Sequence, residues 1–436
     1  MYQLYQSPEA ATQLGWDVAL PLLFMVLLFA LAVPVWVALG FAAIGLLVLT
    51  DVLPLTLFGE ALFSGIDAFA LIAIPLFILT GDVLVRSGLS EKLLDVAEAT
   101  MGSLRSGFGT STVLGCGFFS CISGSDAAGA AAVGRITYSR LVDIGYPRPY
   151  ACALVASGAC TGILIPPSIA YIIIGLILGI SASTLFLAAA VPGVMVMLSI
   201  MLTNVALNRL YGYEASDIRF SFRRWLRAIW AGKFALMIPV IILGGIYSGV
   251  FTPTEAAAVA VVTTIVIGLT QGTLTISDFP QMLESSAKVN GVIVPIIAFA
   301  LPLAQALAAL EVPQTFVQSV QAFTDSPAVV ILLMLGIFIA AGCVMETTPN
   351  IVILSPIMLP LAESIGMDQI HFCIFMVTSL GVGFITPPLG LNLFVLSGLT
   401  GESVIRIAGR AIPYVISMLA VVLLLAFIPE ISLWAL

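Results

Sequence analysis

The chain has 436 residues, of which 61% are hydrophobic and only 9% are charged. A soluble domain usually carries about 25% charged residues, so this composition indicates an integral membrane protein. The apolar runs are long and unbroken, which excludes the alternating pattern of a membrane β-barrel and predicts an all-α fold. The formal net charge of −8, without any basic tract, predicts no nucleic-acid partner.

We expect a membrane-spanning helix wherever about 20 consecutive residues are predominantly apolar. The first such run is longer than one straight span and contains Pro34, so it forms either one tilted helix or two short helices. Residues 88–104 are amphipathic, which predicts a helix lying along the membrane interface. The apolar runs of the first half are 18–50, 68–87, 108–141, 149–180 and 183–207.

The most polar region, residues 208–233, separates the two halves of the chain. It holds six of the fifteen Lys and Arg residues, including Arg219, which predicts a cytoplasmic, membrane-hugging linker. The single histidine, His371, lies at the end of the segment 362–371 and is expected in a loop. The apolar runs of the second half are 234–250, 253–272, 289–311, 327–366, 369–398 and 405–428, with a short segment near 312–324.

Two stretches share one pattern. Residues 158–175 have the sequence GACTGILIPPSIAYIIIG and residues 379–396 have SLGVGFITPPLGLNLFVL, so each carries a Pro-Pro pair shortly after a glycine. Because proline lacks an N–H and clashes with the preceding turn, each pair should interrupt its helix. Backbone groups freed at membrane depth must be buried in protein or line a cavity. Two broken helices at matching places in two halves are expected around the binding site of a secondary transporter.

Prolines and glycines recur in the same order in both halves. The matched pairs are Pro34 with Pro253, Pro75 with Pro295 and Gly162 with Gly383, at separations of 219, 220 and 221 residues. We therefore predict two repeats, 1–207 and 234–436, joined by the linker 208–233. Each repeat would contain a hairpin, 108–141 or 327–366, and a broken helix, 149–180 or 369–398. Basic residues flank the exit of the first hairpin, whereas residues 362–371 contain no Lys or Arg, so the repeats should be inverted.

Six motifs, spread over nearly the whole chain, carry a resemblance to a known family. They are IPLFILTGDVL (74–84), GSDAAGAAAVG (124–134), GILIPPS (162–168), GIYSGVFTPTEAAAVAV (245–261), METTPNIVILSPIMLP (345–360) and GFITPPLGLNLFV (383–395). With these motifs the chain resembles the large membrane subunit of a tripartite ATP-independent periplasmic (TRAP) transporter, a DctM-like member of the ion transporter superfamily.

The resemblance implies a function, partners and a location. It implies sodium-coupled import of a small organic anion, such as a C4-dicarboxylate or sialic acid, or of a zwitterion. A soluble periplasmic binding protein would deliver the substrate, and a small four-span membrane subunit would be the obligate partner. The chain would lie in the inner membrane of a bacterium or archaeon and work as an elevator, with sodium as coupling ion and no other cofactor.

In the family, hairpin tips and broken helices form the sodium and substrate sites. Sodium prefers oxygen ligands, and the residues that could supply them here are Ser123, Gly124, Ser125, Asp126, Thr161, Gly162, Glu346, Thr347, Thr348, Gly383 and Thr386. The half-helices that follow each break begin with a partial positive charge, which favours a substrate carboxylate. The substrate-side candidates are Pro166, Pro167, Ser168, Asn350, Pro387, Pro388 and Asn392. The family's first hairpin often has Ser or Thr where this chain has Asp126.

Other interpretations compete with this one. Asp126 and Glu346 could cap the half-helices of the hairpins instead of binding ions, and small residues near 120–134 could serve close helix packing. A proton-pumping subunit would need lysines within the membrane, and an intramembrane enzyme would need a catalytic motif; the sequence offers neither. The nearest rival is a carrier of the same superfamily that transports dicarboxylates alone, coupled to sodium or protons.

Overall fold

The computed structural model describes residues 8–214 and 221–435, and these ranges form helices and connecting segments without any strand. Within them, seven helical segments are long and apolar enough to cross a membrane, or eight if a bent pair, Phe222–Ala231 with Lys233–Tyr247, forms one span. The all-α membrane fold predicted from the sequence is confirmed.

The first half contains two predicted features: a hairpin of two helices, α6 and α7, and a helix broken into α8, α9 and α10. Its helices are α1 (Pro8–Ala30), α2 (Val35–Thr50), α3 (Leu55–Ile66), the 3₁₀ turn η1 (Phe69–Ile72), α4 (Ala73–Arg86), α5 (Leu89–Met101), α6 (Gly107–Ser123), α7 (Asp126–Ile144), α8 (Arg148–Ala159), α9 (Thr161–Leu164), α10 (Ile169–Leu178) and α11 (Ala182–Tyr211).

The second half contains the equivalent hairpin, α17 and α18, and the equivalent broken helix, α19 and α20. Its helices are α12 (Phe222–Ala231), α13 (Lys233–Tyr247), α14 (Pro253–Thr270), η2 (Ile276–Asp278), α15 (Phe279–Ala309), α16 (Val312–Phe323), α17 (Pro327–Val344), α18 (Thr347–Ser364), α19 (Gln369–Gly383), α20 (Leu391–Thr400), α21 (Val404–Phe427) and η3 (Pro429–Ile431).

Four expectations are refined or corrected. The run 18–50 forms two helices, because Ala32 turns the chain with φ of 57° and Pro34 precedes the first residue of α2. Helix α3 was not predicted, since its 12 residues are too few for a span. The linker is shorter than 208–233, because α11 continues to Tyr211; Arg219 lies outside the described residues. The loop position expected for His371 is wrong: this residue is buried in the first turn of α19, with Nδ1 2.6 Å from Ser432 Oγ.

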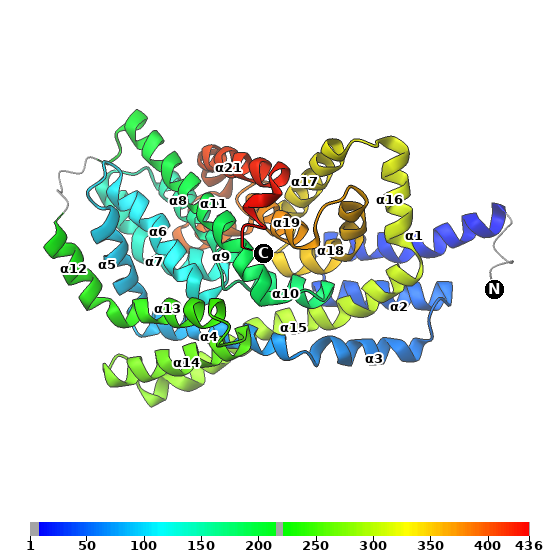
Figure 1. Ribbon diagram of the computed structural model, residues 1–436, viewed down its shortest axis with the longest axis horizontal. Coiled ribbons are helices and arrows are strands. Elements are labelled where there is room, and N and C mark those ends of the chain that lie inside the picture. The colour runs from blue at the N-terminus through cyan, green and yellow to red at the C-terminus, as the bar shows by residue number, and fades with distance from the viewer. Residues whose placement is uncertain (1–7, 215–220, 436) are drawn as a thin grey trace.

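The helices divide between an outer layer and a central group. Figure 1 shows α2, α3, α4, α14 and α15 along one side of the molecule, with the hairpins and broken helices on the other. Helix α15 packs against α2, α3 and α4, and it also contacts α18, while α4 contacts α6. The broken span Arg148–Leu178 forms the core: 83% of its most apolar window is buried, against 39–50% in the other candidate spans of the described chain.

Elements of the two halves recur in the same order and make reciprocal contacts. The second arm of the first hairpin, α7, packs against α20, and the second arm of the other hairpin, α18, packs against α10. The single helix α15 stands where the first half has α3, η1 and α4. Each half therefore completes the packing of the other, which supports the predicted division into repeats at 1–207 and 234–436; that division stays a prediction.

A buried carboxylate fixes the start of the first hairpin. Glu214, which follows α11, accepts hydrogen bonds from the Phe108 N–H (2.7 Å), the Gly109 N–H (3.3 Å) and the Tyr146 hydroxyl (2.9 Å). The first N–H groups of a helix have no partner within the helix, so a carboxylate placed there satisfies them and opposes the positive end of the helix dipole. The segment after α11 thus holds the start of α6 in place. The other end of α6, at Ser123, then lies beside the first Pro-Pro break.

Candidate substrate and cation site

The tip of the first hairpin lies directly on the first break. Gly124 joins α6 to α7 with φ of 62°, a left-handed conformation that favours glycine. A Cβ atom on Gly124 would lie 2.9 Å from the Pro167 carbonyl oxygen, and one on Gly162 would lie 2.5 Å from the Asp126 nitrogen. The Ile169 N–H, at the start of α10, donates to the Gly124 carbonyl at 3.2 Å. Close backbone contact, which only glycine permits, joins tip and break.

The second hairpin contacts its break through a different part of the hairpin. A Cβ atom on Gly383 would lie 2.6 Å from the Gly342 backbone, inside α17. The N–H groups of Leu389 and Gly390 both donate to the Cys343 carbonyl, at 3.1 and 3.2 Å. The second break therefore contacts the last turn of α17.

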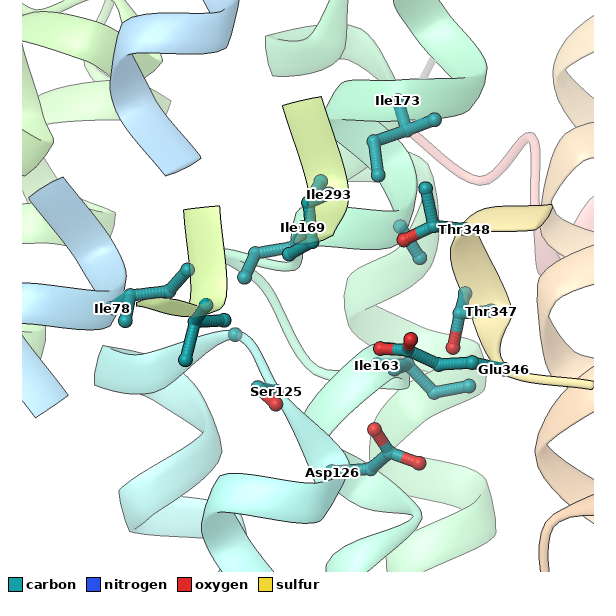
Figure 2. Close-up of a pocket in the computed structure, with 13 residues that line it drawn as sticks. Ile78, Ser125, Asp126, Ile163, Ile169, Ile173, Ile293, Glu346, Thr347 and Thr348 are labelled. Atoms are coloured by element: carbon teal, nitrogen blue, oxygen red, sulfur yellow. The ribbon is translucent and has the colours of Figure 1, made fainter. Parts of the chain in front are cut away.

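Both hairpin tips nevertheless line one cavity. It measures about 410 Å³, part of which is open to solvent, and it lies between the hairpins, the first broken helix and the outer helices α4 and α15 (Figure 2). Its lining residues are Ile78, Gly124, Ser125, Asp126, Ile163, Ile169, Ala170, Ile173, Val289, Ile293, Glu346, Thr347 and Thr348. Six of the predicted cation ligands, three from each tip, are thus brought together by the fold.

Two carboxylates, one from each hairpin tip, line this cavity. Asp126, the first residue of α7, is 3% exposed, whereas Glu346, which precedes α18, is open to the cavity. Figure 2 shows both side chains at the end of the cavity that the hairpin tips form. The capping interpretation fails for Glu346, whose side chain accepts no capping hydrogen bond; in α7 the cap is Ser125, which accepts from the Ala128 N–H at 3.4 Å.

Several predicted residues lie behind the cavity and hold the breaks in shape. The hydroxyls of Thr161, Ser168 and Thr386 donate to the carbonyls of Gly158, Ile163 and Val382, at 2.7, 2.8 and 2.7 Å. The Asn350 amide donates to the Ala341 and Met345 carbonyls, at 3.2 and 3.0 Å, so it closes the second tip. The Asn392 amide donates to the Ala156 carbonyl at 3.3 Å and ties α20 to α8. Each of these hydrogen bonds ties a side chain to a backbone carbonyl beside a break or a tip, and so fixes the local course of the chain.

Oxygen atoms without a hydrogen-bond partner gather around the tips. In the described chain, ten buried side-chain oxygen or nitrogen atoms lack a protein partner, and five belong to predicted site residues. Those five are Ser123 Oγ, Asp126 Oδ2, Thr347 Oγ1, Asn350 Oδ1 and Asn392 Oδ1. A buried polar atom is costly unless something pairs with it, and oxygen is the ligand that hard cations prefer.

The apolar wall of the cavity was not predicted. Ile78 of α4 and Val289 and Ile293 of α15 line it from the outer layer, together with Ile163 and Ile173 of the broken helix. The sequence did contain one indication that these two helices are equivalent: α4 and α15 carry the matched prolines Pro75 and Pro295. Only the folded chain shows that both helices reach the same cavity.

Residues 22–431 match the family model described as "Tripartite ATP-independent periplasmic transporter, DctM component". The chain belongs to this DctM family. It is therefore a large permease subunit of the TRAP type, and its apolar spans agree with a multi-pass protein of the inner membrane.

Curated DctM relatives differ in the substrate that their names state. The chain is 37% identical over 373 residues to the C4-dicarboxylate TRAP transporter large permease of Pseudomonas aeruginosa, covering 85% of this chain and 87% of that protein. It is 29% identical over 408 residues to the sialic acid TRAP transporter large permease of Vibrio cholerae, covering 93% and 95%. It is 34% identical over 418 residues to the isethionate TRAP transporter permease DctMQ of Oleidesulfovibrio alaskensis; the match covers 95% of this chain but 66% of that longer protein.

Solved structures agree with the fold at low sequence identity. The Alcanivorax borkumensis YdaH transporter superposes with a TM-score of 0.62 at 14% identity, covering 96% of this chain and 99% of that one. Neisseria gonorrhoeae MtrF gives a TM-score of 0.61 at 14% identity, covering 95% and 96%. This DctM-family chain therefore shares its fold with these two proteins.

Proposed function

We propose that this permease imports a small organic acid, anionic or zwitterionic, together with sodium ions. A periplasmic binding protein delivers the acid, and a small four-span membrane subunit completes the transporter. The observation that carries the proposal is the single cavity that both hairpin tips line, at the junction of a broken helix and two outer helices. Sites between such elements are where transporters of this architecture bind substrate and ions.

The donor set supports sodium as the coupling ion. The partnerless atoms at the tips are all oxygens, from hydroxyl, amide and carboxylate groups. No histidine or cysteine is among the cavity-lining residues that the structure describes. Softer metals prefer such nitrogen and sulfur ligands, whereas oxygen suits hard ions. The carboxylate of Asp126, buried without a charged partner, supplies the negative charge that a cation requires in a site of low dielectric constant.

Uptake into liposomes tests both parts of this function. The permease, its small subunit and its binding protein are reconstituted, and accumulation of a labelled organic acid is followed with an inward gradient of sodium. Potassium replaces sodium in a matched sample. We expect accumulation only with sodium and only when the binding protein is present. Equal uptake in potassium contradicts sodium coupling, and uptake by the permease alone favours the stand-alone carrier.

A further inference from the structure

We propose that helix α12 (Phe222–Ala231) is a binding site for anionic phospholipids of the membrane leaflet beside it. Its exposed aromatic and aliphatic side chains enter the leaflet, and the arginines next to them bind lipid phosphates. A linker lying along the membrane was expected from the sequence. The structure adds the residues that face the lipid and the charge that the lipid headgroup must carry.

The orientation of α12 follows from the helix after it. At Gly232 the chain bends by 71° from α12 into α13 (Lys233–Tyr247), which is apolar after its first residue and exposes Met237 and Val240. A helix bent by this angle from a membrane-crossing segment lies closer to the membrane surface than to its normal. Continuing α12 into the bilayer core would place three arginines there, which is costly. Helix α12 therefore lies at the interface.

Two of the faces of α12 are exposed, one apolar and one basic. Phe222, Leu226 and Trp230 are four residues apart, so they form one stripe at 3.6 residues per turn, and they are 62%, 51% and 70% exposed. Arg223 and Arg227 form the neighbouring stripe and are also exposed. An exposed apolar stripe bordered by cations is the pattern of a helix whose apolar side enters the boundary between headgroups and acyl chains.

The third face of α12 holds the helix on the protein. Arg224 donates to Glu98 of α5 at 3.1 Å, and Trp225 Nε1 donates to the Thr100 hydroxyl at 3.2 Å. Helices α12 and α5 pack together at the edge of the molecule (Figure 1). Glu98 also pairs with Arg140 of α7 at 2.8 Å, so α12 is connected through α5 to the first hairpin. Because this face contacts the protein, the apolar and basic stripes are turned away from it.

The charges beside the apolar stripe decide which lipid fits. Helix α12 has three arginines and no acidic residue, and within the described ranges Arg224 alone of the three forms an ion pair. Arg223 and Arg227 are therefore available to a ligand. The Lys233 ammonium lies 4.1 Å from the centre of the Trp230 ring and brings another positive charge to this rim. Guanidinium groups bind phosphate oxygens in pairs, and cations at a membrane surface favour lipids with a net negative charge.

Quenching of tryptophan fluorescence tests both the insertion and the headgroup preference. The full chain is reconstituted in vesicles of phosphatidylcholine and phosphatidylglycerol, and one of the two lipids carries bromine on its acyl chains, which quenches a tryptophan in contact with it. The signal of Trp230 is the difference between this chain and Trp230→Phe. We expect both brominated lipids to quench Trp230. Phosphatidylglycerol should compete about fivefold to thirtyfold better than phosphatidylcholine, the range for one or two arginines near a membrane surface.

Variants of α12 identify the groups that cause the preference. Changing Arg223 and Arg227 together to glutamine removes both lipid-facing charges and should lower the preference for phosphatidylglycerol by about fivefold or more. Changing the same two residues to lysine keeps the charges and should keep most of the preference. Arg224→Gln removes a charge from the face that contacts α5, so it is the matched control and should leave the preference unchanged.

The small membrane subunit is the other possible occupant of this face, and it gives a different result. Vesicles that contain the permease together with that subunit should show the same quenching of Trp230. Loss of the quenching would assign the apolar stripe to the subunit and overturn the proposal. The proposal is also overturned if neither lipid quenches Trp230, if the two lipids compete equally, or if the preference survives the change of Arg223 and Arg227 to glutamine.

Discussion

The two Pro-Pro breaks have the same sequence pattern and different surroundings. Pro166 and Pro167 are buried, and every residue from 150 to 175 is buried with them. Pro387, Pro388 and Leu389 are exposed. The first break contacts the tip of its hairpin, whereas the second contacts the hairpin arm before the tip. Equal local patterns thus give unequal environments, because the remainder of the chain decides which break is covered.

The largest expected effect comes from filling the contacts between hairpin and break. Gly162→Ala places a Cβ 2.5 Å from the Asp126 nitrogen, and Gly383→Ala places one 2.6 Å from the Gly342 backbone. Backbone cannot rotate away as a side chain can, so each variant should lose roughly 1–3 kcal/mol of stability and most of its transport. Uptake in liposomes and thermal unfolding in nanodiscs measure the two effects.

Two other glycines serve as matched controls for that prediction. A Cβ on Gly398 or Gly409 meets nothing within 4 Å, and both residues lie within helices. Their alanine variants should keep uptake and unfold at or slightly above the normal temperature. Normal transport by Gly162→Ala would show that tip and break need not touch.

Replacing each Pro-Pro pair by Ala-Ala distinguishes the buried break from the exposed one. Alanine favours a continuous helix, so both variants should lose transport while still inserting in the membrane. Only the variant at Pro166 and Pro167 also leaves a cavity in a packed region. Its free energy of unfolding should therefore be roughly 1–3 kcal/mol lower than that of the variant at Pro387 and Pro388. Thermal unfolding of the two variants side by side makes the comparison. Equal losses of stability would contradict the difference in packing between the two breaks. Unchanged uptake would show that transport does not require the breaks.

In the described chain a carboxylate anchors the start of α6, whereas the first turn of α17 has no acidic residue and no side-chain cap. Glu214→Ala leaves the Phe108 N–H, the Gly109 N–H and the Tyr146 hydroxyl without their acceptor, which should cost roughly 1–3 kcal/mol. Helix α17, the equivalent of α6, begins with Pro327 after Ser326, whose side chain makes no capping bond. Ser326→Ala should therefore change little. A comparable loss in both variants, measured by thermal unfolding, would mean that Glu214 is not a specific anchor.

The smallest effect on stability is expected at the surface. There the two halves of the chain differ in their charged residues. Glu98 of α5 pairs with Arg140 at 2.8 Å and with Arg224 at 3.1 Å, whereas α16, the equivalent of α5, has no charged residue. The two arginine side chains are about half exposed, so Arg224→Gln should cost about 0.2–1 kcal/mol and depend on salt. Thermal unfolding at low and high salt measures this. A loss that is larger and independent of salt would indicate that Arg224 contributes packing as well as charge.

Much of the architecture could be predicted from the sequence. Apolar run lengths gave the spans, and the recurrence of Pro75 with Pro295 and Gly162 with Gly383 indicated two halves. The pairs Pro166–Pro167 and Pro387–Pro388 located both breaks, because proline ends a helix through its own covalent structure. Helix α3 escaped prediction for the opposite reason: it is too short for a span, and it is stabilised by packing against α15.

The candidate site was only half determined by the sequence. Residue types alone placed Asp126 and Glu346 at the tips of two hairpins, since each follows a helix break and precedes a new helix. The sequence does not state that both carboxylates enter one cavity, that isoleucines of α4 and α15 close it, or that Thr161 and Ser168 hold the break from behind. The cavity joins residues as far apart in the sequence as Ile78 and Thr348, a separation of 270 positions (348 − 78), and such contacts follow from packing and not from local backbone preference. The chain itself specifies where its helices break, and only the tertiary structure decides what those breaks face.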